Sequence, residues 1–142
     1  MNPQGEVFRA LGNVVRAVRA RLDRALQRSG LRLGQYQVLR LLWEEDGLTP
    51  REIADRLAVE MPTVTRTAQR MLRDGLVERQ AHPDDARSVR IYLTKRGVDL
   101  RQQLAELIAE QTEHALRGFT PQERAAFVEM LERIHENAKY EP

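Results

Sequence analysis

The stretch that decides the fold is TPREIADRLAVEMPTVTRTAQRMLRDGLVERQAHPDDARSVRIYLTKRG, residues 49–97. It opens on a capping box, in which Thr49 is a good N-cap and Glu52 stands three residues later. After a short break, Pro62 opens a second helix, which ends at Gly75. Two short helices separated in this way predict a helix-turn-helix.

A hairpin is predicted directly after the second helix. Residues 76–80 have extended character, and residues 81–87 hold proline and aspartate, which favour turns. Residues 88–93 then alternate between apolar and polar side chains, which is the period of a strand. Together these segments predict two strands joined by a longer loop.

Helical periodicity continues on both sides of this stretch. Apolar residues recur at steps of three and four over 6–28 and 33–45. A helix begins again at Thr94 and breaks at Gly118, and a second capping box at Thr120 opens the last one. The sequence therefore predicts a mainly α chain with one small β-hairpin, an α+β fold.

Composition excludes several classes of protein. A chain of 142 residues with 42% hydrophobic and 31% charged residues is expected to form one folded domain. The sequence predicts neither a membrane-spanning segment nor a secretion signal. We therefore expect a cytoplasmic protein. The sequence has no Cys, which removes thiolate chemistry, and its three His residues form no ligand cluster, so we expect no metal and no other cofactor. It also has neither a phosphate loop nor a nucleophile–base motif, so we expect that the protein is not an enzyme.

Charge is unevenly distributed along the chain. Residues 1–48 carry eight Arg and five acids, residues 49–97 carry ten basic and seven acidic residues, and residues 98–142 carry five basic and nine acidic residues. The first two thirds are thus basic, and the last third is acidic. This asymmetry permits a polyanionic partner without requiring one.

The helix of residues 62–74 has two contrasting faces. Val64, Ala68, Met71 and Leu72 mark the side that is expected to face the core. The other side and its flanks carry no carboxylate before Asp74 and consist of Pro62, Thr63, Thr65, Arg66, Gln69, Arg70 and Arg73. Arg can bond guanine and Gln can bond adenine through paired hydrogen bonds, and a helix N-terminus attracts phosphate. The alternative is a basic solvent face without a ligand.

The hairpin adds a second basic feature. Asp85 stands two residues before Arg87 and is expected to hold its guanidinium extended toward a narrow minor groove. Arg90 lies on the polar side of the following strand. The alternative for Asp85 and Arg87 is a surface ion pair that contributes little to stability.

Residues 85–97, DARSVRIYLTKRG, fit the pattern D-x-R-x-x-x-[VI]-x-L-T-x-x-G. This pattern resembles the wing of the MarR family of bacterial transcriptional regulators. Residues 63–66, TVTR, and residues 72–79, which include Gly75, resemble the recognition helix of that family and its exit. The resemblance covers nearly the whole chain, including its length and its order of helices.

The resemblance implies a single MarR-type domain over 1–142. Its winged helix-turn-helix part would be 33–97, and its helical dimerisation part would be 6–28 with 95–138. Such a homodimer would bind double-stranded DNA at a pseudo-palindromic operator, with 62–74 in the major groove and the wing, 81–88, in the minor groove. The residues that would contact or orient DNA are then Pro62, Thr63, Thr65, Arg66, Gln69, Arg70, Arg73, Asp85, Arg87 and Arg90.

Members of this family often respond to small aromatic or anionic effectors. By that resemblance Arg16, Tyr36, Arg40 and Trp43 would line an effector pocket, although ordinary packing also explains the two aromatic residues. The hydroperoxide sensors of the family use a cysteine, so the chain is expected to lie outside that branch. The sequence leaves one rival function open, a winged-helix module that binds protein rather than DNA.

Overall fold

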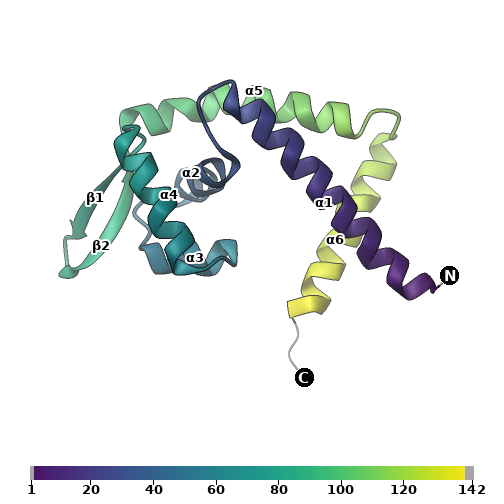
Figure 1. Cartoon of the computed structure of the whole chain (residues 1–142), viewed down its shortest axis with the longest axis horizontal. Coiled ribbons are helices and arrows are strands. Elements are labelled where there is room, and N and C mark those ends of the chain that lie inside the picture. Colours follow the sequence, from purple (N-terminus) through teal and green to yellow (C-terminus); the bar gives the residue numbers. More distant parts are fainter. Residues whose placement is uncertain (1, 140–142) are drawn as a thin grey trace. The chain divides into compact units, whose positions relative to one another are not determined.

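The computed structural model describes residues 2–139, apart from the side chain of Ala86. The secondary-structure elements follow one another as α1 (Pro3–Gln27), α2 (Leu33–Glu44), α3 (Pro50–Leu57), α4 (Met61–Arg73), β1 (Val77–His82), β2 (Asp85–Leu93), α5 (Lys95–Ala115) and α6 (Pro121–Lys139) (Figure 1). The two strands form one antiparallel sheet. The predicted fold class, mainly α with one β-hairpin, is confirmed.

The turn between α1 and α2 is set by a glycine and an aspartate. Gly30 has a φ of +74°, and the N–H of Leu31 donates to the carbonyl of Leu26 at 3.1 Å, which is the pattern that closes a helix C-terminus. Asp23 Oδ1 accepts the N–H of Leu33 at 2.9 Å and so caps the start of α2 from the neighbouring helix.

The helix-turn-helix has the predicted caps with two differences. Thr49 Oγ1 accepts the N–H of Glu52 at 3.1 Å, but the Glu52 carboxylate lies 3.8 Å from Arg90, on β2. The predicted capping box at Thr49 is therefore only half formed. In addition, α4 begins at Met61, because Ala58 takes a left-handed conformation with a φ of 54° and completes the turn before it.

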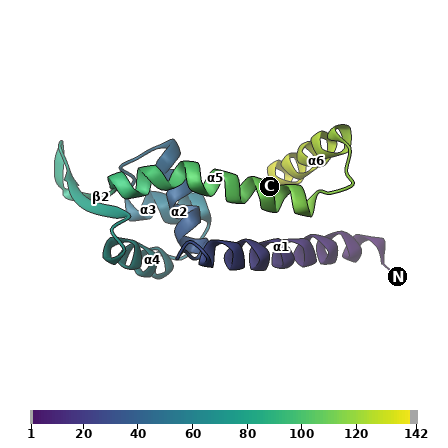
Figure 2. The ribbon, with the colours of Figure 1, turned by 90° about the horizontal axis from the view of Figure 1, so that it is seen from above.

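The hairpin is longer than the sequence predicted. Cross-strand pairing runs from Val77 opposite Leu93 to Ala81 opposite Val89, and after a register shift His82 pairs with Asp85. The predicted loop over 81–87 is therefore wrong. The strands continue because their backbone groups pair, and a bulge absorbs the local mismatch. The hairpin projects away from α2 and α3 (Figure 2).

The core joins the predicted helix-turn-helix to parts of both flanking helices. Fourteen buried apolar residues form one cluster: Leu26, Leu31, Val38, Leu39, Leu42, Leu48, Ile53, Ala54, Val64, Met71, Leu76, Val77, Ile91 and Leu104. Leu26 belongs to α1 and Leu104 to α5, which the sequence assigned to a separate helical part. By its internal contacts the chain divides into two compact units, one up to Ile108 and one from Ala109.

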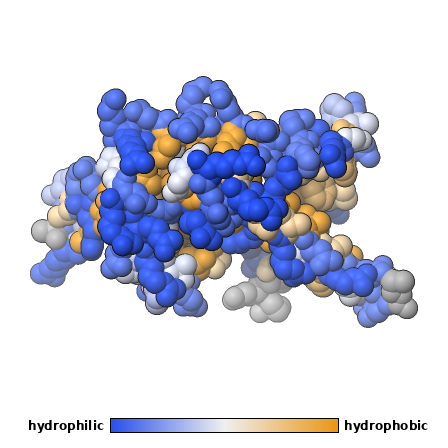
Figure 3. Space-filling model, turned by 45° about the horizontal axis from the view of Figure 1, so that its top comes forward, coloured by the Kyte–Doolittle hydropathy of each residue, from blue (hydrophilic) through white to orange (hydrophobic). Residues whose placement is uncertain are grey.

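Several helices expose apolar side chains in the single chain. Val7, Val14, Val15 and Val18 of α1 are each 38% exposed or more. The described residues of α6 include none that is buried, although Phe127, Met130, Leu131 and Ile134 lie along one side of that helix. Apolar areas accordingly interrupt the hydrophilic surface in Figure 3.

Within the described part of the chain, no helix is both long and apolar enough to cross a membrane.

Candidate nucleic-acid interface

The outward face of α4 is free of carboxylates. Val64, Ala68 and Met71 are buried as predicted, with at most 8% exposed, whereas Leu72 is only half-buried. The exposed residues of the helix include every member of the predicted face: Pro62, Thr63, Thr65, Arg66, Gln69, Arg70 and Arg73. Acidic residues appear only at the caps, Glu60 and Asp74. The helix therefore presents three arginines and a glutamine to solvent with no acid between them.

A hollow of about 530 Å³ opens beside α4, where the end of α1 and the start of α2 approach it. Four arginines and one aspartate supply its charge: Arg19, Asp23, Arg32, Arg66 and Arg70. Its remaining walls come from Ala20, Leu33, Gly34, Gln35, Thr63 and Thr67. The hollow is thus strongly cationic, and it extends the basic surface of α4 toward α1 and α2.

The aspartate of the hollow is already engaged. Arg32 donates to both oxygens of Asp23, at 3.1 and 3.0 Å, and the Leu33 N–H donates to one of them. These hydrogen bonds from Arg32 and Leu33 hold the pKa of Asp23 below its usual value, although partial burial opposes them. Asp23 therefore offsets Arg32 and leaves Arg19, Arg66 and Arg70 to define the charge of the hollow.

The wing differs from its prediction in how Asp85 acts. Asp85 Oδ1 accepts the backbone N–H of Arg87 at 3.0 Å. The ion pairs of the described residues include none between Asp85 and the Arg87 guanidinium. Asp85 thus shapes the backbone of the turn, and Arg87 is exposed at the tip of the hairpin.

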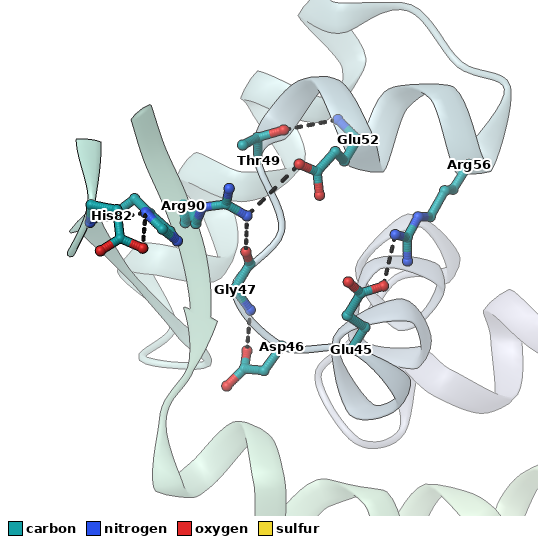
Figure 4. A network of polar contacts seen from close by, with 9 residues as sticks. Glu45, Asp46, Gly47, Thr49, Glu52, Arg56, His82 and Arg90 are labelled. Carbon is teal, nitrogen blue, oxygen red and sulfur yellow. Dashed lines mark hydrogen bonds and ion pairs between the residues drawn. The ribbon is translucent and has the colours of Figure 1, made fainter. Parts of the chain in front are cut away.

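Arg90 points toward the body of the protein. Its Nη1 donates to the carbonyl of Gly47 at 3.0 Å and lies 3.8 Å from Glu52 Oε1, as Figure 4 shows. Its side chain is only 26% exposed. The structure therefore separates Arg90 from the exposed arginines of α4 and the wing.

The predicted effector residues divide between two helices. Tyr36 and Trp43 of α2 pack edge to face, with ring centroids 6.2 Å apart, and Trp43 Nε1 donates to the Gly97 carbonyl at 2.9 Å. Burial raises the pKa of Tyr36, and the nearby charge of Arg40 partly opposes this. Arg16 instead donates to Asn13 within α1, at 2.6 Å. None of the four lines the cationic hollow.

Sequence reasoning missed the contributions of α1 and α2 to this surface. Arg19 and Arg32 lie far from α4 in sequence, and Asp23 lies among several charged residues of an ordinary helix. The only signal was the excess of eight Arg over five acids in residues 1–48. That excess indicates a basic segment but does not say which arginines approach α4.

Comparison with known proteins identifies the family of the chain. Residues 31–89 match the model of the MarR family. The chain is 31% identical over 108 residues to the organic hydroperoxide resistance transcriptional regulator of Bacillus subtilis (strain 168), covering 72% of this chain and 71% of that protein. It is also 37% identical over 97 residues to the HTH-type transcriptional regulator TtmR of Methylorubrum extorquens (strain PA1), which covers 68% of this chain. The chain spans 49% of the length of TtmR.

Solved structures share the fold. A MarR transcriptional regulator from Methanosarcina mazei Go1 has a TM-score of 0.87 and 26% identity, with 94% of this chain and 96% of that chain covered. A putative MarR family transcriptional regulator from Listeria monocytogenes, complexed with 26mer DNA, has a TM-score of 0.82 and 22% identity over 92% and 87% of the two chains. On its matched residues and its relatives, the chain belongs to the MarR family of transcriptional regulators.

Proposed function

We propose that the chain is a cytoplasmic, homodimeric repressor of transcription, which places α4 in the major groove of its operator and Arg87 in a neighbouring minor groove. The observation that carries this proposal is the carboxylate-free face of α4, where three arginines and Gln69 are exposed together. Most solvated helix faces mix charges of both signs, whereas a face of Arg and Gln matches base edges and phosphates. Family membership supports the same function.

The dimer is proposed from the exposed apolar sides of α1 and α6. A helix in water owes most of its stability to burial of its apolar face, and no described residue of α6 is buried in the single chain. Phe127, Leu131 and Ile134 would be covered by a second copy. Two copies of α4 then bind half-sites about one helical turn apart.

We place the effector in the cationic hollow beside α4 rather than at the four residues predicted from sequence. Arg19, Arg66 and Arg70 converge there around open space, whereas Trp43 is engaged with Gly97. A small aromatic anion is attracted by this charge. Because Arg66 and Arg70 also belong to the DNA-binding face, such a ligand competes with DNA for them.

Selection of bound genomic fragments tests the proposal. Fragments retained by the purified protein should share an inverted repeat whose half-sites lie about one turn apart. Footprinting that shows a single unpaired half-site would refute the dimeric mode of binding. Retention of no fragment at low salt would instead favour a winged helix that binds protein.

A further inference from the structure

Three hydrogen bonds join strand β2 to the turn between α2 and α3. Ile91 N–H donates to the Leu48 carbonyl at 2.8 Å, and the two residues form an isolated β-bridge. Asp46 Oδ1 accepts the N–H of Leu93 at 2.9 Å, and Arg90 donates to the Gly47 carbonyl at 3.0 Å. The hairpin is therefore attached to the turn that leads into the helix-turn-helix (Figure 4).

Gly47 lies at the centre of this joint, by which we mean the contacts of residues 46–48 with residues 90–93 of β2. Gly47 has a φ of +71°, and a Cβ there would lie 2.6 Å from a ring carbon of Tyr92. Both features disfavour larger residues at this position, because the turn passes close against β2, where the Gly47 carbonyl accepts a hydrogen bond from Arg90. The joint thus depends on a close backbone approach as well as on side chains.

Arg90 also connects the joint to α3. Glu52 lies in the first turn of that helix, and its carboxylate lies 3.8 Å from the Arg90 guanidinium. Arg90 Nε is buried and has no hydrogen-bond partner among the described residues. The guanidinium is therefore held inside the joint, and its charge is partly neutralised before DNA approaches.

We propose that Arg90 is a positioning residue, which fixes the wing relative to α3 and α4 through Gly47 and Glu52 and so places Arg87 for the minor groove. This inference rests on the proposed function, because Arg87 must contact DNA for the placement to matter. It departs from the sequence-based prediction, in which Arg90 itself contacts DNA. A direct contact would require Arg90 to leave both partners.

A double-mutant cycle between Arg87 and Arg90 tests the proposal in the full chain. Arg87→Ala should weaken operator binding about tenfold in the wild-type background and by less than about threefold in an Arg90→Met background, because the wing is no longer placed. Equal effects of Arg87→Ala in the two backgrounds would show independent contacts and overturn the proposal. A wild-type protein that binds no DNA overturns the proposed function instead.

Glu52→Gln is a second test, because the two possible roles of Arg90 predict opposite changes in operator affinity. The substitution also keeps the chain close to its native structure. If Arg90 is a positioning residue, Glu52→Gln weakens operator binding and reduces the effect of Arg87→Ala, as Arg90→Met does. If Arg90 binds DNA directly, Glu52→Gln removes a nearby negative charge and tightens binding. This variant decides the matter even where Arg90→Met does not fold.

Amide hydrogen exchange gives a readout that needs no DNA. In Arg90→Met the amides of Ile91 and Leu93 should exchange at least about tenfold faster, while those of Val64 and Met71 in α4 keep their rates, because only the joint is loosened. Faster exchange throughout the first unit would show a general loss of stability and overturn a positioning role. Lys95→Met, which removes an exposed charge from α5, is the matched control and should leave both sets of rates unchanged.

Discussion

Gln35 Nε2 donates to Asp74 Oδ2 at 3.1 Å and thereby ties the first turn of α2 to the residue that ends α4. Gln35 is 3% exposed, and its Oε1 also accepts the N–H of Arg32 at 2.9 Å. One buried amide therefore bonds both the residue that precedes α2 and the residue that ends α4. The orientation of α4, on which DNA binding depends, is coupled to the start of α2 through this residue.

Replacement of Gln35 tests that coupling. Gln35→Leu keeps the volume of the side chain but leaves the Arg32 N–H without its acceptor, so we expect a loss of about 1–3 kcal/mol in the free energy of unfolding. Urea denaturation measures it. Gln103→Leu, at an exposed position of α5, is the control and should change stability by less than about 0.5 kcal/mol. Equal stability of Gln35→Leu and wild type would contradict the role of the bridge.

The lowered pKa of Asp23 predicts that the free energy of unfolding depends on pH. Its pKa is lowered in the folded chain by Arg32 and Leu33, so its stabilising contribution is present above the pKa of the unfolded state and disappears as pH falls through the folded pKa. Asp23→Asn should therefore be less stable than wild type at pH 7 by about 1 kcal/mol, and the difference should shrink below about pH 4. Urea denaturation at several pH values measures this. A difference that stays constant with pH would show that the charge is irrelevant; Asp55→Asn, on the exposed side of α3, is the control.

The apolar side of α6 forms part of the proposed dimer interface. Leu131→Glu places a charge on a surface that a second copy must bury, so the variant should sediment as a monomer at concentrations where wild type is a dimer. Glu132→Ala changes a neighbouring exposed residue and should leave the dimer intact. A wild-type protein that sediments as a monomer at every concentration would remove the dimer from the account.

Replacement of two arginines tests the proposed effector site. Arg19 lines the hollow, and Arg40 is one of the effector residues predicted from sequence. Calorimetry with a panel of aromatic carboxylates should show binding to wild type that Arg19→Ala weakens at least about tenfold, because Arg19 lines the hollow. Arg40→Ala, which removes a charge beside Tyr36, should leave that affinity unchanged. The reverse result would place the effector at the residues that the sequence indicated.

Periodicity predicted α4 well because burial and helical spacing act on the same residues: Val64, Ala68 and Met71 are buried, and the arginines between them are exposed. Periodicity misplaced Arg90 for a physical reason. Alternation put Arg90 and Tyr92 on the polar side of β2, but the turn at Gly47 covers that side in the folded chain. No local pattern reports such a long-range cover.

The same limit applies to the hollow and to the hairpin. Arg19 and Arg32 reach Arg66 and Arg70 only through tertiary packing, so neither spacing nor charge could identify the group. The hairpin extends to His82 and Asp85 because backbone groups pair across it, and proline and aspartate in the segment suggested a longer loop. The wing motif found the correct segment but not the length of its strands.

The salt dependence of binding to duplex DNA tests the central claim most directly. If α4 and the wing contact several phosphates, the affinity of wild type should fall at least about a thousandfold between about 50 and 200 mM salt. The variant Arg66→Ala/Arg70→Ala should bind more weakly with a shallower slope, whereas Arg133→Ala, an exposed arginine of α6, should match wild type. No binding at about 50 mM salt, or an affinity that does not change with salt, would contradict the assignment of α4 and the wing to DNA.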